Sequence, residues 1–260
     1  MNNRPFVFDD GHAYEETMVP WLRPVGETFV DWLDPPSGLK WIDVGCGTGV
    51  SIELLIQRCA PRAVEGIDPS ESQLNIARAR PALRDVSLRN GSAMALPHED
   101  DSFDAALMAG VVPAVPDPAR CVSEMARVVR SGGIVAAYQW DITNGGFPHE
   151  PVLAELKTFG ITEPLPPSGA ATGVDRLREI WTGAGLRSVE TREVLVEREF
   201  PTFEAFWNAI MMVTLRPTIA AMSAEAVEQL KDHVRRKVTT RSDGTVVGCG
   251  RATAVKGWVA

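Results

Sequence analysis

The sequence predicts an α/β protein with a doubly wound, mostly parallel sheet of seven strands and helical cover elements. Three observations predict it. Short β-rich runs alternate with longer amphipathic runs between residues 41 and 138, a glycine-rich turn follows the first run, and an alternating run near the C-terminus predicts a last, antiparallel strand. A chain of 260 residues, 45% of them hydrophobic, is long enough to bury one sizeable core, so we expect one domain with elaborations.

Five strands are expected in the first part of the chain. Each is a short run rich in β-branched and other apolar residues, and a helix or a turn separates successive runs. The predicted strands are residues 40–44, 63–67, 86–88, 103–108 and 134–138. Apolar residues recur at helical spacing in the predicted helices, which are residues 50–59, 71–79 and 119–129.

The second part of the chain predicts a different arrangement. Five prolines between residues 148 and 167 indicate a connection between two parts. A helical segment then separates two alternating runs, which predict two strands that pair antiparallel. These predicted elements are a helix over residues 175–184, strands over 189–200 and 245–255, and the helical segment 202–237.

Charge and composition exclude several classes of function. The formal net charge of -8 and the pI of about 5.1 disfavour binding to nucleic acid or to anionic lipid. No long apolar run or leader-like N-terminus is present, so we expect a cytoplasmic protein. We also expect a monomer or a homodimer. The four cysteines have no CxxC spacing and the four histidines are scattered, so neither a disulfide scaffold nor a metal site is expected.

A glycine-rich turn, residues 43–49 (DVGCGTG), follows the first strand and opens a helix, which is where a doubly wound sheet binds its ligand. Glycines let the backbone turn tightly and approach a ligand, and free amides at the helix N-terminus attract an anion. The spacing is GxGxG, with Val50 in place of a third glycine, so neither the NAD nor the P-loop motif is met. Asp68 ends the second strand, where its carboxylate can accept hydrogen bonds from both hydroxyls of a ribose.

Four segments extend this pattern into a family motif set: WIDVGCGTG (41–49), GIDPS (66–70), GSAMALPHEDDSFD (91–104) and RVVRSGG (127–133). In order and spacing they resemble the class I S-adenosylmethionine-dependent methyltransferases, in the group related to ubiquinone and menaquinone biosynthesis methyltransferases. The resemblance covers roughly residues 41–138. It implies a Rossmann-like fold, S-adenosyl-L-methionine as cofactor and S-adenosyl-L-homocysteine as product.

The resemblance also implies which residues surround the cofactor. Those of the glycine turn would surround the methionine part, Asp68 would hold the ribose, and residues 92–94 would border the adenine. The implied cofactor-binding residues are Asp43, Gly45, Cys46, Gly47, Asp68, Pro69, Ser92, Ala93, Met94 and Ala109. Two departures stand out. Ser92 replaces the usual aspartate, so backbone and water would hold the adenine, and the loop 112–115 lacks the histidines of relatives, which weakens the quinone assignment.

Methyl transfer from a sulfonium is an in-line displacement with a neutral leaving group, so positioning alone can supply much of the acceleration. A neutral acceptor needs a general base as well. Asp141, after the fifth strand, is the first candidate, although it could instead cap the following turn. His149 is the second candidate, and Tyr14 and His12 are weaker ones.

Three segments make up the predicted single methyltransferase domain, 1–260: a helical lid (1–35), broken at Pro20 and Pro24, a cofactor-binding core (40–141) and a helical insertion (202–241) over the acceptor site. Large side chains of the cover elements, and one at the end of the fifth strand, are expected to line that site. They are Tyr14, Trp21, Trp140, Trp207 and Met211, with Phe206 and Met212 nearby. The same helical spacing is typical of residues that pack into a core, and that alternative stays open.

The sequence thus predicts an S-adenosylmethionine-dependent methyltransferase that acts on an oxygen, nitrogen or carbon atom of a small organic molecule. One alternative is a protein that binds the same cofactor and uses its sulfonium to assist a decarboxylation or a cyclisation. Another is a non-catalytic sensor. A dinucleotide-dependent oxidoreductase is disfavoured by the GxGxG spacing.

Overall fold

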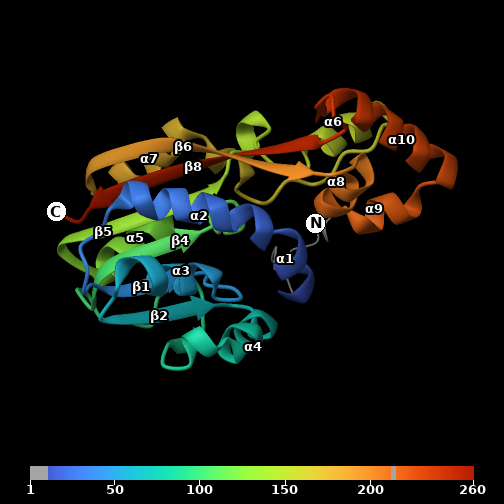
Figure 1. Cartoon of the computed structure of the whole chain (residues 1–260). Coiled ribbons are helices and arrows are strands. Elements are labelled where there is room, and N and C mark those ends of the chain that lie inside the picture. The colour runs from blue at the N-terminus through green and yellow to red at the C-terminus, as the bar shows by residue number, and fades with distance from the viewer. Residues whose placement is uncertain (1–10, 212–214) are drawn as a thin grey trace.

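The computed structural model of the protein describes residues 11–211 and 215–260. A single sheet runs through the molecule, with helices on both sides of it and a further group of helices at one end (Figure 1). The strands are β1 (Lys40–Val44), β2 (Ala63–Asp68), β3 (Ser87–Asn90), β4 (Phe103–Ala109), β5 (Val129–Trp140), β6 (Arg187–Phe200), β7 (Thr239–Thr240) and β8 (Val246–Trp258).

The helices include two before the first strand and a cluster between β6 and β8. They are α1 (Gly11–Thr17), α2 (Val19–Leu33), α3 (Val50–Cys59), α4 (Glu71–Ala79), α5 (Pro118–Val128), α6 (Glu150–Thr158), α7 (Val174–Gly183), α8 (Phe203–Ile210), α9 (Arg216–Ala221) and α10 (Ala224–Lys237). Three short 3-10 turns, η1 (Pro81–Leu83), η2 (Ile142–Asn144) and η3 (Gly169–Thr172), complete the set.

The strand order is β3-β2-β1-β4-β5-β8-β6, and β7 pairs with β8. Pairs from β3 to β5 are parallel, whereas β8 runs antiparallel to β5 and to β6. The predicted α/β fold is therefore confirmed, and the two-residue β7 is an addition to it. Because β1, β2 and β4 are parallel, their carboxyl ends lie at one edge of the sheet, as expected for the ligand-binding edge.

Alternation along the strands builds two apolar clusters. On β1, Trp41 belongs to one cluster and Ile42 to the other, because successive side chains point to opposite faces of a sheet. The first cluster packs α2, α3 and α4 onto the sheet, and the second packs α5 and α7 onto it. Both faces are therefore covered, which makes the carboxyl edge the accessible part of the parallel strands.

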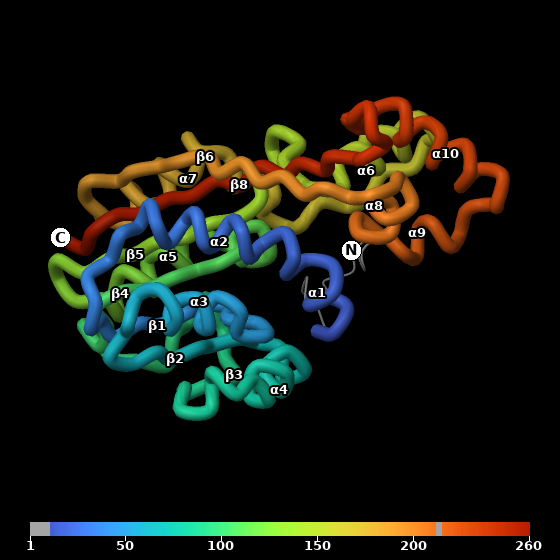
Figure 2. The backbone as a smooth tube through the Cα atoms, in the orientation of Figure 1, coloured from blue at the N-terminus to red at the C-terminus, as the bar shows by residue number. Residues whose placement is uncertain are grey.

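The helical lobe, which we define as α6, α8, α9 and α10, lies at one end of the long strands β6 and β8 (Figure 2). Phe200, at the end of β6, contacts Phe206 of α8 with ring centroids 5.6 Å apart. Helix α6 lies within the proline-rich stretch that the sequence presents as a connection. It forms because Val152 and Leu156 bury an apolar face, and α6 packs on α10.

The first helices differ from the prediction at the prolines. Helix α2 contains Pro20 in its first turn, where the missing N–H costs no helical hydrogen bond, and it continues through Pro24. Val25, Phe29 and Val30 are buried against the core, and this burial outweighs the one bond lost at Pro24. The segment forms a pair of helices that reaches Leu33, as the sequence predicts, but the break between them falls at Met18 and neither proline interrupts α2.

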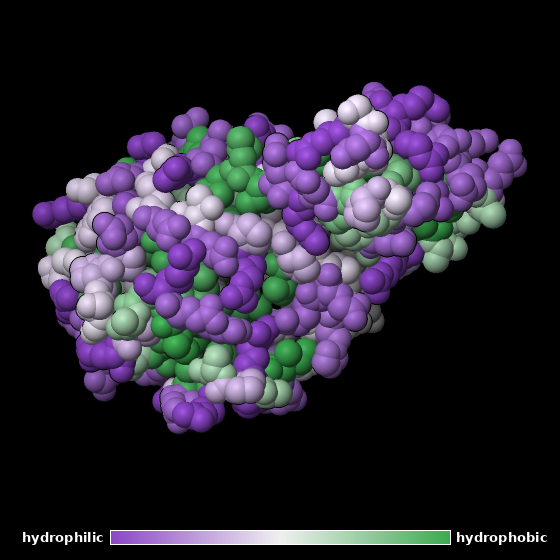
Figure 3. All heavy atoms as spheres, viewed as in Figure 1, coloured by the Kyte–Doolittle hydropathy of each residue, from purple (hydrophilic) through white to green (hydrophobic). Residues whose placement is uncertain are grey.

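Most of the face drawn in Figure 3 is hydrophilic, including the helical lobe, as expected for a chain with a net charge of -8. No helix within residues 11–211 and 215–260 combines the length and apolar character needed to cross a membrane.

Candidate active site

The glycine turn after β1 depends on backbone conformations that favour glycine. Gly45 has φ +79°, and a Cβ built on it would lie 2.4 Å from a methyl group of Val111. The amides of Gly45 and Cys46 both donate to the carbonyl oxygen of Ile67, at 2.7 and 3.1 Å, which ties the turn to the end of β2. The backbone therefore stays bare and fixed where a ligand can approach it.

Asp68, the last residue of β2, lies beside this turn. Its Oδ2 accepts a hydrogen bond from the Gly47 amide at 2.9 Å, and its Oδ1 accepts one from the Ser70 amide at 2.8 Å. Burial raises the pKa of this carboxyl, and the two amides oppose that effect. Since each carboxylate oxygen has a second lone pair, the carboxylate can still accept hydrogen bonds from a ligand.

Asp43, on β1, is fully buried next to the turn. Its Oδ2 accepts a hydrogen bond from the Ser51 hydroxyl of α3, and its Oδ1 has no partner among the described residues. Burial, with a smaller contribution from the charge of Asp68, raises the pKa of Asp43 to about 7. Within the described chain no basic side chain bonds to Asp43 or Asp68, so the cleft attracts a cation.

Helix α1 covers the glycine turn and is held there by charged groups. The Glu15 carboxylate accepts hydrogen bonds from the Thr48 hydroxyl and from the Arg80 guanidinium, the latter at 2.6 Å. Arg80 also donates to the Thr48 carbonyl at 2.6 Å and pairs with Glu53 at 2.7 Å. The space left at the turn, the cofactor cleft, has a volume of about 40 Å³, far less than a nucleoside occupies.

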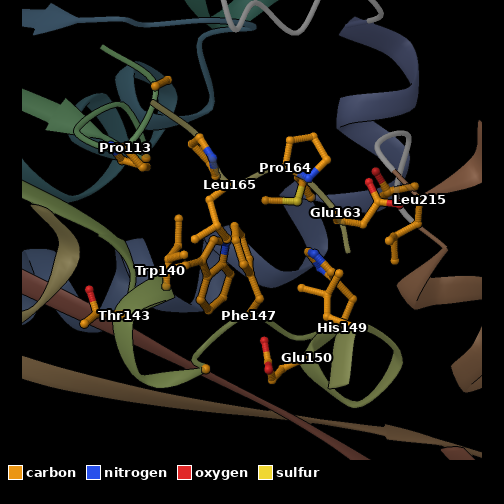
Figure 4. A pocket seen from close by; sticks show the side chains of 18 of the residues that line it. Pro113, Trp140, Thr143, Phe147, His149, Glu150, Glu163, Pro164, Leu165 and Leu215 are labelled. Atoms are coloured by element: carbon orange, nitrogen blue, oxygen red, sulfur yellow. The ribbon is translucent and has the colours of Figure 1, made fainter. Parts of the chain in front are cut away.

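A much larger cavity adjoins this cleft. Its volume is about 640 Å³, within the range of small-molecule sites, and it lies between the first two helices, the carboxyl ends of β4 and β5, and α6 (Figure 4). Most of the side chains that line it are apolar. The lining residues include Tyr14, Met18, Leu22, Pro113, Trp140, Phe147, His149, Glu150, Leu153, Lys157, Glu163, Leu165 and Leu215.

The cleft and the cavity meet. Tyr14 and Leu22 line both of them. On β5, Tyr138 lines the cleft, whereas Trp140 lines the cavity. The glycine turn and the cavity are therefore neighbouring sites that share two bordering residues.

His149 and Asp141, the two predicted base candidates, have different surroundings. His149 lines the cavity, and no described residue bonds to its side chain. Asp141 is fully buried outside the lining. Its Oδ2 accepts from Arg251 at 3.2 Å, and its Oδ1 accepts from the Asn144 amide at 3.2 Å. These partners favour the turn-capping role that the sequence left open for Asp141.

The predicted substrate residues divide into two groups. Tyr14 and Trp140 line the cavity. Trp21, Trp207 and Met211 do not line it and pack into the apolar core instead, where Trp21 contacts Phe200 with centroids 5.9 Å apart. The described part of the helical insertion reaches the cavity through Leu215, and Met212 lies outside the described residues. Exposed His12 is absent from the lining.

The other predicted cofactor residues lie along the same edge of the sheet. Cys46 and Ala109 line the cofactor cleft. Pro69 and Ser92 are exposed, and Met94 is half-buried with its amide 3.1 Å from the Ser92 hydroxyl. Ala93, between them, is buried. This stretch forms an open shelf beyond the end of β3.

Several residues at the site carry no motif and were missed by sequence reasoning. Tyr138, Glu15 and Arg80 are the main ones. The position of Tyr138 near the end of a predicted strand could have indicated it. The pairing of Glu15 with Arg80 joins residues 65 apart in the chain, and nothing in the local pattern marks either of them.

Comparison with known proteins identifies the class. Residues 42–137 match the methyltransferase domain family. A demethylmenaquinone methyltransferase of Halalkalibacterium halodurans is 31% identical over 177 residues, which cover 60% of this chain and 70% of that enzyme. The chain therefore belongs to the class I S-adenosylmethionine-dependent methyltransferases related to the quinone methyltransferases.

Two further proteins are similar to this chain, one in sequence over the core and one in fold. The chloroplastic 2-methyl-6-phytyl-1,4-hydroquinone methyltransferase 2 of Oryza sativa subsp. japonica is 40% identical over 96 residues, which span 37% of this chain and 28% of the rice enzyme. Phosphoethanolamine N-methyltransferase 2 of Haemonchus contortus, crystallised with S-adenosyl-L-methionine, has the same fold. Its TM-score is 0.60 at 16% identity, over 95% of this chain and 56% of that one.

Proposed function

We propose that this chain transfers the methyl group of S-adenosylmethionine to an oxygen, nitrogen or carbon atom of a small organic molecule bound in the 640 Å³ cavity. The observation that carries the proposal is that the cleft and the cavity are neighbours, with Tyr14 and Leu22 bordering both. The relatives named above as methylating a quinone or a hydroquinone support an aromatic acceptor. The net charge of -8 supports an acceptor other than nucleic acid.

The residues of the cleft suit the cofactor by their charge and by the bare backbone of the glycine turn. The partnerless Oδ1 of Asp43 suits its ammonium group, Asp68 suits the two ribose hydroxyls, and the bare backbone at Gly45 and Gly47 allows close approach. Residues 92–94 would border the adenine on the open shelf. When bound, the cofactor supplies a methyl group on a sulfonium, and displacement leaves a neutral thioether.

The chain's own part is to position the acceptor and to exclude water. Apolar walls desolvate the acceptor, and Tyr14 and Leu22 bring it to the junction with the cleft. Because the cleft of about 40 Å³ is smaller than the cofactor, α1 has to move away for entry and can close again afterwards.

Calorimetric titration with S-adenosylhomocysteine tests the cofactor assignment. Asp68→Ala is expected to weaken binding by about 1 to 3 kcal/mol, because it removes hydrogen bonds to the ribose. The matched control is Asp85→Ala, which removes an exposed carboxylate without a role in the cleft and should leave the affinity unchanged. Equal affinities of the two variants would contradict the assignment of Asp68.

A methyl-transfer assay with pooled phenols, amines, carboxylic acids and thiols then tests the reaction. Turnover of a pool identifies the acceptor class. Tight binding of S-adenosylhomocysteine without turnover of any pool would favour a sensor or a sulfonium-assisted reaction. We also propose a cytoplasmic location and a monomeric or homodimeric state; sedimentation at several protein concentrations measures the latter.

A further inference from the structure

His149 is a buried histidine with an unused side chain. It is 5% exposed, it immediately precedes α6, and its Nδ1 has no hydrogen-bond partner among the described residues. Its ring lies against Phe147, with centroids 4.6 Å apart and planes inclined by 30°. Figure 4 shows the imidazole directed into the cavity, between Phe147 and Leu215. The Nδ1 atom is itself enclosed, so a molecule in the cavity can reach the imidazole only through the part of the ring that lines the cavity.

The charged and titratable groups around the ring do not bond to it. Glu150 and Lys157 of α6 line the same cavity, as do Glu163, whose carboxylate accepts from Thr218, and Tyr14 of α1. The Nδ1 of His149 forms no hydrogen bond with any of these side chains in the described chain. Burial lowers the pKa of His149 to about 4, so the ring is neutral near pH 7 and can accept a proton.

We infer that His149 is the catalytic base that takes the proton of the acceptor's hydroxyl, and that this hydroxyl is carried by an aromatic ring. The inference rests on the proposed function. The acceptor oxygen attacks the methyl carbon, the O–CH3 bond forms, the S–CH3 bond breaks, and its electron pair stays on the sulfur. The hydroxyl proton passes to His149, which then releases it to solvent.

Two features select a phenol rather than an alcohol. Trp140 and Phe147 both line the cavity (Figure 4), and aromatic side chains in a cavity wall favour contact with an aromatic ring. The pKa of a phenol, about 10, lies several units below that of an alkyl alcohol, so an imidazole takes the proton of a phenol more readily.

A binding experiment that needs no turnover tests the hydrogen bond. With S-adenosylhomocysteine present, the affinities of p-cresol and of its methyl ether, which lacks the donor, are compared by calorimetry. The wild-type protein is expected to prefer p-cresol by about five- to tenfold, the usual effect of one hydrogen bond. His149→Phe should remove that preference while still binding the ether, because phenylalanine fills the same space beside Phe147.

The matched control is His98→Phe, which replaces another largely buried histidine, packed against Phe103 with centroids 5.0 Å apart and outside the cavity lining. This variant should keep the wild-type preference. An equal preference in wild type and His149→Phe, or no binding of either probe to the wild type, would overturn the inference. Titration with S-adenosylhomocysteine alone reports separately on the proposed function.

Turnover of phenols of graded acidity tests the base itself. At about pH 9 an alkyl phenol is still mostly neutral, whereas p-nitrophenol is ionised and needs no base. His149→Gln is expected to lower kcat for p-cresol by about 10²- to 10⁴-fold, the range of general-base catalysis, and to change kcat for p-nitrophenol little. Equal losses on both phenols would contradict a base and indicate a packing role.

Discussion

The buried carboxylate of Asp43 lowers the stability of the free protein, yet it is suited to bind a cation. Its carboxylate is enclosed, it keeps a single described hydrogen-bond donor, Ser51, and Asp68 adds a second negative charge nearby. A cation bound in the cleft would offset both costs. The residue that weakens the free protein is therefore the one that the cofactor's ammonium group can stabilise.

Asp43→Asn is expected to stabilise the free protein and to weaken ligand binding. The folded-state pKa of Asp43, about 7, lies above its unfolded value near 3.8, so ionisation favours the unfolded state as pH rises. The cost grows between these two pH values and reaches about 4 kcal/mol above them. Urea unfolding at pH 4 and at pH 8 should show the gain at the higher pH, and S-adenosylhomocysteine should bind about tenfold more weakly.

Asp104→Asn is the matched control, because the same substitution is expected to lower the stability of the protein at pH 8 instead of raising it. The Lys40 amide donates to the Asp104 carboxylate at 2.7 Å, and the guanidinium groups of Arg130 and Arg62 lie 2.6 and 2.5 Å from it. Together they hold the pKa of Asp104 at about 2, below the unfolded value. The stabilisation by Asp104 is therefore present above pH 4 and is lost as the pH falls towards 2. A loss of stability at pH 8 in both variants would contradict the account of Asp43.

At the scale of elements, α1 is the part whose position decides whether the cleft is open. It is attached at its exposed side through Glu15, which meets Thr48 of the glycine turn and Arg80 after α4. Both members of the Arg80–Glu15 pair are partly exposed, at 20% and 27%, so the pair contributes little stability and can open readily.

Glu15→Gln should therefore speed exchange of the ligand at the cleft. Stopped-flow fluorescence with S-adenosylhomocysteine measures the rates, which we expect to rise about fivefold, as for the loss of about 1 kcal/mol of attachment. Salt should accelerate the wild type and leave the variant less affected. Glu16→Gln, which changes the exposed neighbouring residue, is the control. Equal exchange rates in Glu15→Gln and Glu16→Gln would show that Glu15 does not hold α1 at the cleft.

Elements with local signals were predictable, and the cavity was not. The bounds of α3 and α4 follow from periodicity between defined ends, such as Ser70, whose hydroxyl accepts from the Gln73 amide at 3.4 Å. Helix α6 depends on packing against α10, which is remote in sequence. For the same reason the sequence could not decide between Asp141 and His149: the partner that engages Asp141, Arg251, is 110 residues away.

At the scale of the whole molecule, the cavity lies where three parts of the chain meet: the N-terminal helices, the parallel sheet and the helical lobe. Each contributes lining residues, among them Met18, Trp140 and Leu153. No single segment could close around an acceptor by itself. This cavity also holds His149, a buried histidine. Because burial disfavours the protonated ring, we expect His149 to lower the free energy of unfolding in acid.

The free energy of unfolding, measured between neutral and acid pH, should show this loss of stability. The folded-state pKa of His149, about 4, lies below the unfolded value of 6.5, so protons bind preferentially to the unfolded chain as pH falls through that interval. Between pH 7.5 and pH 4.5 this linkage removes about 2 to 3 kcal/mol from the free energy of unfolding.

His149→Phe removes the titrating group, so its urea-unfolding free energy should fall less over that interval than the wild type's. The comparison uses each protein's own change with pH, so a constant packing effect of the substitution cancels. Parallel curves for the two proteins would mean that the ring is already protonated, or hydrated, in the folded state, and would leave it unable to take a proton from an acceptor at neutral pH.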